Sequence, residues 1–201
     1  MVNLPNALTL LRIVLVPVFA VAFVLPGTGA RLVAFFVFCL AGISDALDGL
    51  AARKLQASSD FGRMLDPIAD KILVGVALMM LVAEGSVYQF NLTTGLSSLL
   101  RLVPALIILT REFLVSGLRE FLAHADVSVP VTFFSKIKTT IQMIAIGAMI
   151  LGPIADKVVH GAMAIAYVLL WIAAALTVYT GAIYLRAGLA HTRPKSGGEP
   201  V

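Results

Sequence analysis

Apolar runs long enough to cross a lipid bilayer recur about six times along this 201-residue chain. A membrane-spanning helix needs about 20 mostly apolar residues, because the hydrocarbon core is about 30 Å thick and a helix rises about 1.5 Å per residue. The chain is 60% hydrophobic and only 13% charged, whereas soluble domains average about 25% charged residues. We therefore predict an all-α integral membrane protein. The runs cover residues 8–26, 31–52, 62–83, 99–120, 134–152 and 161–186.

Turn residues separate the runs, as in the Pro-Gly-Thr-Gly sequence at residues 26–29 and the Gly-Pro pair at residues 152–153. This pattern predicts six transmembrane helices in a single domain over residues 1–190. Residues 3–9 are expected to form a short interfacial helix before the first span. The last residues, 191–201, read HTRPKSGGEPV and are expected to be a disordered polar tail.

The lysines and arginines predict the orientation of the helices. If the N-terminus is cytosolic, only Arg31, Arg101 and Lys157 fall on the outer side. Basic residues are concentrated in cytoplasmic segments of membrane proteins, so this distribution predicts a cytosolic N-terminus. The twelve basic residues on the cytosolic side are Arg12, Arg53, Lys54, Arg63, Lys71, Arg111, Arg119, Lys136, Lys138, Arg186, Arg193 and Lys195.

Four aspartates interrupt the second and third runs near their cytosolic ends. Asp45 and Asp48 are three residues apart, and Asp66 and Asp70 are four apart, so each pair lies on one stripe of a helix. Both pairs span depths of about 6 to 12 Å below the helix ends. Facing carboxylates in a low dielectric repel one another and would protonate unless cations offset them. Oxygen ligands of this number suit two Mg²⁺, Mn²⁺ or Ca²⁺ ions, an arrangement used for displacement at phosphorus.

Two alternatives apply to this region. Asp66 precedes Pro67, so it could instead cap a third helix that begins there. The small residues Gly49, Ala52 and Gly62 continue the aspartate stripes. They could leave a cleft for a bulky ligand, or they could simply allow the helices to pack closely.

The aspartates and their neighbours resemble the signature of the CDP-alcohol phosphatidyltransferases, with all eight specified residues and every gap matching. This resemblance implies a six-helix membrane enzyme, usually a homodimer, that transfers a phosphatidyl group from a CDP-linked lipid to an alcohol and releases CMP. The matching pattern is Asp45-x2-Asp48-Gly49-x2-Ala52-Arg53-x8-Gly62-x3-Asp66-x3-Asp70.

Flanking segments are similar to the phosphatidylglycerophosphate synthase branch of that family. They are NLPNALTLLRIVLVPVF at residues 3–19, TREFLVSGLREF at residues 110–121 and KIKTTIQMIAI at residues 136–146. The resemblance implies transfer from CDP-diacylglycerol to the hydroxyl of glycerol 3-phosphate, giving phosphatidylglycerophosphate and CMP. It also implies a bacterial cytoplasmic (inner) membrane location, an active site facing the cytosol, and no nucleic-acid partner.

The family's residue roles can be carried over by position. The four aspartates would hold two Mg²⁺ or Mn²⁺ ions, and Asp70 would also be the general base for the acceptor hydroxyl. The nucleotide site would be lined by Gly49, Ala52, Arg53 and Gly62. Spacing alone does not determine which aspartate is the base.

Four basic residues of the fourth and fifth runs are candidates for binding the acceptor phosphate. They are Arg111, Arg119, Lys136 and Lys138. Arg111 is expected at the depth of Asp45, where an arginine is costly unless it lines a polar cavity. Arginine suits bidentate phosphate binding, and lysine acts as a point charge. The alternatives are lipid-headgroup contact for the other three, and ion pairs of the arginines with Glu112 or Glu120.

Asn6, Thr9 and Arg12 recur at every third residue and form a polar stripe on the first segment. A role near the nucleotide is one interpretation, and capping by Asn6 with lipid contact by Arg12 is another.

Two other functions fit parts of the pattern. One is the same chemistry with a different acceptor, such as inositol phosphate, serine or another phosphatidyl lipid. The other is a divalent-metal transporter, since intramembrane carboxylates also mark ion paths. Transporter sites usually lie at the membrane midplane in repeated halves with broken helices, whereas these aspartates lie near one face and no second copy of the pattern occurs.

Overall fold

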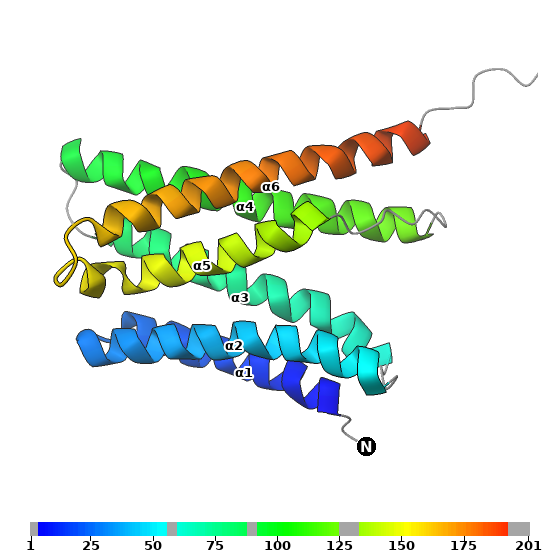
Figure 1. Cartoon of the computed structure of the whole chain (residues 1–201), viewed down its shortest axis with the longest axis horizontal. Helices are drawn as coiled ribbons and strands as arrows, with labels where there is room; N and C mark the ends of the chain where they lie inside the picture. The colour runs from blue at the N-terminus through cyan, green and yellow to red at the C-terminus, as the bar shows by residue number, and fades with distance from the viewer. Residues whose placement is uncertain (1–3, 56–59, 88–91, 125–132, 193–201) are drawn as a thin grey trace, which may run out of the picture.

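The computed structural model describes residues 4–55, 60–87, 92–124 and 133–192 and confirms an all-α fold (Figure 1). Within the helices, the side chains of residues 45–55, 60–64, 66, 67 and 70, among others, lie outside that description. The six helices are α1 (Leu4–Val24), α2 (Thr28–Leu55), α3 (Asp60–Val87), α4 (Leu92–His124), α5 (Phe133–Ala155) and α6 (Ala162–Thr192).

The helices alternate in direction along the long axis of the molecule (Figure 1). We call the end that contains the start of α1, the end of α2 and the start of α3 the aspartate end, because the signature aspartates lie toward it. The opposite end contains the α1–α2 and α5–α6 connections. Glycines with positive φ occur in both of these connections, at Gly27 (φ 106°) and Gly161 (φ 92°). Only glycine adopts such angles readily, which explains why the turns occur there.

The helix bounds differ from the expected bounds in two places. The short interfacial helix predicted for residues 3–9 is not a separate element, since α1 is continuous from Leu4 to Val24. Pro5 lies in its first turn, where a missing N–H costs nothing. At the other end, α6 continues to Thr192, two residues beyond the predicted end of the domain. The rest of the predicted tail, residues 193–201, lies outside the described residues.

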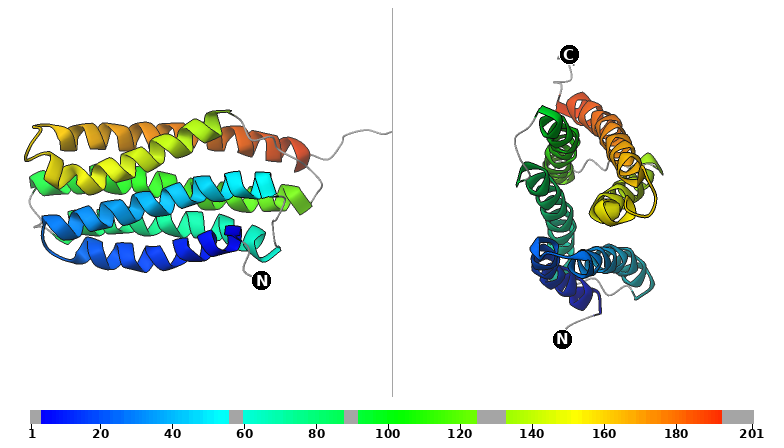
Figure 2. Two further views of the ribbon diagram at one scale, coloured as in Figure 1. Left: turned by 60° about the horizontal axis from the view of Figure 1, so that its bottom comes forward. Right: turned by 90° about the vertical axis from the view of Figure 1, so that its left-hand side faces the viewer.

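The packing places α1 and α2 on one side of α3, and α4, α5 and α6 on the other (Figure 2). α1 contacts both α2 and α3, α6 contacts both α4 and α5, and α2 also contacts α5. The core between α1 and α2 is aromatic: Phe19 and Phe38 are fully or almost fully buried, and their ring centroids are 6.0 Å apart. These contacts fix the axial register between neighbouring helices, that is, which residues of two helices lie at the same level.

The outer surface is strongly apolar, with exposed side chains such as Val21, Phe36, Met79 and Phe113. Two helical stretches, Ser135–Ala155 and Ala162–Arg186, are long and apolar enough to cross a membrane, and Thr9–Val24 and Thr28–Ser44 are shorter apolar stretches. An apolar surface of this extent cannot face water without aggregation. The long apolar helices indicate a membrane protein, and six membrane-spanning helices stay a prediction.

Candidate active site

The four signature aspartates lie at matched positions in two antiparallel helices. Asp45 and Asp48 are ten and seven residues before the end of α2, while Asp66 and Asp70 are six and ten residues after the start of α3. At about 1.5 Å per residue, both pairs lie about 10 to 15 Å from the same end of the bundle. Because α3 begins at Asp60, Asp66 lies inside the helix and does not cap it.

The first helix brings a buried arginine to the level of the aspartates. Phe19 of α1 packs against Phe38 of α2, and the two helices are antiparallel. Arg12, seven residues before Phe19, therefore lies level with Asp45, seven residues after Phe38. Arg12 is 0% exposed and Thr9 is also buried. The alternative of lipid contact by Arg12 is thus wrong, because its guanidinium is inside the protein.

The fifth helix brings a buried lysine to the same level. The Arg31 Nε of α2 donates to the Ile150 carbonyl of α5 at 2.7 Å, and Gly42 of α2 is in close contact with the Met143 side chain. Lys138 lies five residues before Met143 on this antiparallel helix, so it is level with residue 47, between the two aspartates of α2. Its side chain is only 5% exposed.

The fourth helix places Arg111 one turn or less from the level of Asp70. A Cβ atom at Gly75 of α3 would lie 3.6 Å from the Leu109 Cδ2 of α4. Arg111, two residues after Leu109, is consequently level with Leu73, which is three residues after Asp70. Five helices thus carry aspartates or largely buried cations to one layer of the bundle.

Arg111 and Lys138 share one carboxylate. The Lys138 ammonium donates to Glu112 Oε1, and the Arg111 Nη1 lies 3.5 Å from the same oxygen. The two cations and one anion leave a net charge of +1 in a partly buried setting. A group of this charge attracts a phosphate anion, and Arg111 and Lys138 are the kinds of side chain that bind one.

Arg111 is also held by the sixth helix. Its Nη2 donates to the Thr180 Oγ1 at 3.0 Å, and its guanidinium carbon lies 5.9 Å from the centroid of the Tyr184 ring. Gly181 makes room for the arginine, because a Cβ there would lie 3.0 Å from the Arg111 Cγ. Arg111 also lines a mostly apolar groove of about 650 Å³ between α4 and α6.

Three buried polar atoms of this region have no hydrogen-bond partner within the described part of the chain. They are Arg111 Nε, Gln142 Oε1 and Thr177 Oγ1. Buried polar groups are rarely left without partners in native proteins, so we expect water or a ligand to satisfy these atoms.

Two of the remaining predicted site residues lie away from the cluster, and the side chains of the others are not described. Arg119 and Lys136 are exposed, so the structure does not gather them with Arg111 and Lys138. Side chains that lie outside the description are Asn6, Asp45, Asp48, Gly49, Ala52, Arg53, Gly62, Asp66 and Asp70.

The sequence predictions missed three residues of the arginine site. The sequence indicates Glu112 only as a competing partner of the arginines, and no motif or spacing singles out Thr180 or Tyr184. Their only sequence signal is that a buried arginine on α4 needs polar or aromatic neighbours.

The donor chemistry of the aspartates fits divalent cations. Among the side chains that the structure describes, no three acidic, histidine or cysteine groups are close enough to hold a metal ion, and the signature aspartates are not part of that set. Their helix positions nevertheless bring four carboxylate-bearing residues to one layer. Oxygen ligands are those that Mg²⁺ and Mn²⁺ prefer.

Comparison with known proteins places these residues in a family. Residues 2–179 match the family model described as CDP-alcohol phosphatidyltransferase. A protein of Rickettsia felis named CDP-diacylglycerol–glycerol-3-phosphate 3-phosphatidyltransferase is 43% identical over 92% of this chain and 94% of its own length. Proteins of the same name from Pectobacterium atrosepticum and Haemophilus influenzae are 39% and 35% identical, each over 92% of this chain and over 94% and 92% of their own lengths. The chain therefore belongs to the CDP-alcohol phosphatidyltransferase family.

Proposed function

We propose that this protein transfers a phosphatidyl group from CDP-diacylglycerol to glycerol 3-phosphate, giving phosphatidylglycerophosphate and CMP. The relatives that match over more than nine-tenths of the chain carry the name of this activity. The observation that carries the proposal is the common level of the signature aspartates and the Arg111–Glu112–Lys138 cluster. Carboxylates for the transfer chemistry and cations for a phosphorylated acceptor are thereby brought to one layer.

In the proposed reaction, a glycerol 3-phosphate hydroxyl attacks the phosphorus of CDP-diacylglycerol that carries the diacylglycerol. A new P–O bond forms to the acceptor, and the P–O bond to CMP breaks, so CMP leaves with the bonding electron pair. Asp70 accepts the hydroxyl proton as the general base. Arg111 and Lys138 hold the acceptor phosphate, and Glu112 fixes the spacing between these two cations before the phosphate arrives.

Two Mg²⁺ or Mn²⁺ ions held by Asp45, Asp48, Asp66 and Asp70 would offset the charge on the diphosphate and on the departing CMP. Gly49, Ala52, Arg53 and Gly62 would line the nucleotide site. Arg12 is buried at the level of Asp45 and adds positive charge to the same layer, so we assign it to the electrostatics of the aspartate cluster together with Thr9. Asn6 extends the same stripe.

The proposed setting is the cytoplasmic membrane of a bacterium, as a homodimer of one-domain chains. Six spanning helices with a cytosolic N-terminus place the aspartate end at the cytosolic surface, where water-soluble glycerol 3-phosphate arrives. The basic residues on the cytosolic side support this orientation.

The acceptor can be tested directly with purified protein, CDP-diacylglycerol and Mg²⁺ or Mn²⁺. We expect CMP release to depend on glycerol 3-phosphate. Inositol phosphate, serine and phosphatidylglycerol should support at most a small fraction of that rate. Faster release with one of the other acceptors would keep the transfer chemistry and reassign the acceptor.

Gly181 provides a sharper test of the arginine site. Replacing Gly181 with alanine should raise the apparent KM for glycerol 3-phosphate about 3- to 10-fold. The added Cβ would lie 3.0 Å from Arg111 Cγ, so the arginine must shift by a few tenths of an ångström. Small displacements of binding groups cost measurable activity, since a 1 Å misplacement can cost about 100-fold. The measurement is steady-state kinetics at saturating CDP-diacylglycerol.

Gly117→Ala is the matched control, because a Cβ there meets no described atom within 4 Å. Its KM should equal that of the parent protein. An unchanged KM in Gly181→Ala, or an equal rise in both variants, would remove Arg111 from the acceptor site.

A further inference from the structure

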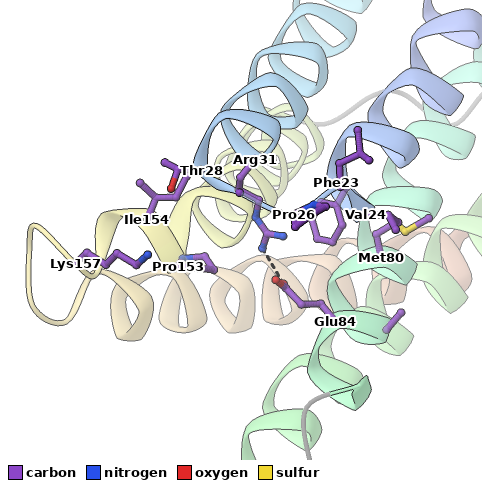
Figure 3. A pocket seen from close by; sticks show the side chains of 13 residues that line it. Phe23, Val24, Pro26, Thr28, Arg31, Met80, Glu84, Pro153, Ile154 and Lys157 are labelled. Carbon is purple, nitrogen blue, oxygen red and sulfur yellow. Dashed lines mark hydrogen bonds and ion pairs between the residues drawn. The ribbon is translucent and has the colours of Figure 1, made fainter.

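Three basic residues are expected on the outer side of the membrane, and they lie near one another at the end opposite the aspartates. They are Arg31, Arg101 and Lys157. Arg31 Nη2 donates to Glu84 Oε2 at 2.7 Å, and Arg101 Nη1 lies 3.6 Å from the same oxygen. Lys157 lines the same cavity as Arg31 and Glu84 (Figure 3). The reaction described above uses none of these residues, so their grouping calls for a separate explanation.

The cavity has a volume of about 570 Å³ and lies between the α1–α2 turn, the end of α3 and the α5–α6 connection. Its polar lining includes Thr28, Arg31, Glu84 and Lys157. The other walls are mainly apolar, with contributions from Phe23, Val24, Leu25, Met80, Pro153 and Ile154. A cavity of this volume can take a small headgroup together with the adjoining part of an acyl chain.

The polar groups of the cavity are held in place by the fold. Arg31 has a side chain only 11% exposed, donates from Nε to the Ile150 carbonyl at 2.7 Å, and lies 4.1 Å from the centroid of the Phe23 ring. The connection that carries Lys157 is fixed by Asp156, whose Oδ1 accepts from the Gly161 and Met163 amides at 3.1 Å. The site therefore needs little ordering when a ligand binds.

Positive charge remains in the cavity after the internal ion pairs are counted. Arg31, Lys157 and Glu84 sum to +1, and Arg101 beside Glu84 adds a further positive charge. Within the described chain, neither the Lys157 ammonium nor the Thr28 hydroxyl has a hydrogen-bond partner. Thr28 also begins α2, and the unpaired amides of a helix start favour an anion. The Arg31 and Lys157 cations and these donors surround one space.

We propose that this cavity binds the phosphate of an anionic phospholipid, with the first carbons of its acyl chain against the apolar walls. Charge selects an anion, and the apolar walls select an amphiphile over a free phosphate. The position at the helix ends matches the depth at which lipid headgroups lie. In the proposed orientation the cavity lies at the outer leaflet of the membrane. The binding site itself does not depend on the proposed catalytic function, but this choice of leaflet rests on the proposed orientation.

The test uses the full chain, purified in an uncharged detergent, and measures thermal stabilisation as short-chain lipid is added. Dihexanoyl phosphatidylglycerol should give saturable stabilisation at lower concentration than dihexanoyl phosphatidylcholine or inorganic phosphate. Lys157→Gln should weaken the apparent affinity for phosphatidylglycerol about fivefold, since one lysine near a lipid phosphate contributes about 1 kcal/mol. Lys157→Arg should restore it.

Arg186→Gln is the charge-matched control, because this substitution also removes a single positive charge. Arg186 is exposed and lies near the other end of α6. It should leave the affinity unchanged. Equal affinities for phosphatidylglycerol and phosphatidylcholine, or equal losses in Lys157→Gln and Arg186→Gln, would overturn the proposal. Inorganic phosphate binding as tightly as phosphatidylglycerol would overturn the lipid assignment. Transferase activity is measured in parallel. Lys157→Gln should have a normal turnover number, so a loss of lipid affinity can be distinguished from a failure of the proposed function.

Discussion

Asp70→Asn should lower the turnover number about 10²- to 10⁴-fold, the usual contribution of a general base. Asparagine keeps the shape of the side chain and one oxygen ligand, but it cannot accept the hydroxyl proton at neutral pH. Asp70 lies within one helical turn of the level of Arg111, so a glycerol 3-phosphate whose phosphate is held by Arg111 can place a hydroxyl near it. Binding of CDP-diacylglycerol should change much less, because the other three aspartates remain.

Asp48→Asn is the control, since Asp48 is proposed only as a metal ligand. Raising the Mn²⁺ concentration should partly restore its activity, because mass action refills a weakened site. The same titration should not restore the turnover number of Asp70→Asn. Both variants are measured with purified protein at saturating CDP-diacylglycerol and glycerol 3-phosphate. Full recovery of Asp70→Asn at high Mn²⁺ would show that Asp70 is only a ligand, and Asp66 would then be the first candidate for the base.

The helices were predictable because a membrane helix must be apolar over a fixed length, and the turns between them contain proline and glycine. The bounds were less predictable, because hydropathy marks the embedded part of a helix and not its full extent. α4 begins at Leu92, seven residues before the apolar run that predicted it. The threonines and serines at its start are too polar for the hydrocarbon but can still be helical.

The depth of the four aspartates was predictable, because it depends on spacing within one helix. The intervals between the aspartates predicted matched depths, and the helix bounds of α2 and α3 agree with that. Burial of Arg12 was not predictable, because a polar stripe looks the same whether it faces lipid or a neighbouring helix. The pairing of Arg111 with Thr180 joins residues 69 positions apart. Such contacts follow from how α4 packs on α6, which no local pattern encodes.

Arg111→Ala should raise the apparent KM for glycerol 3-phosphate about 10- to 100-fold. A charge-assisted hydrogen bond contributes about 1.5–3 kcal/mol, which corresponds to that loss of affinity. The structure adds a second reason. Without Arg111, Lys138 and Glu112 form a neutral pair, so the acceptor dianion meets no net positive charge in the cluster. The measurement is the KM for each substrate with the other held at saturation.

Arg119→Ala separates the cluster from general surface charge, because Arg119 lies on the same helix but is exposed. Its KM for glycerol 3-phosphate should rise less than fivefold, the size expected for one exposed charge of about 1 kcal/mol or less. The KM of Arg111→Lys for glycerol 3-phosphate should lie between those of Arg111→Ala and Arg119→Ala. Lysine keeps the positive charge but cannot reproduce the guanidinium contacts with both Thr180 and Glu112. A raised KM for CDP-diacylglycerol with an unchanged KM for glycerol 3-phosphate in Arg111→Ala would move this arginine to the lipid-nucleotide site. Its position on the groove between α4 and α6 would then account for that role.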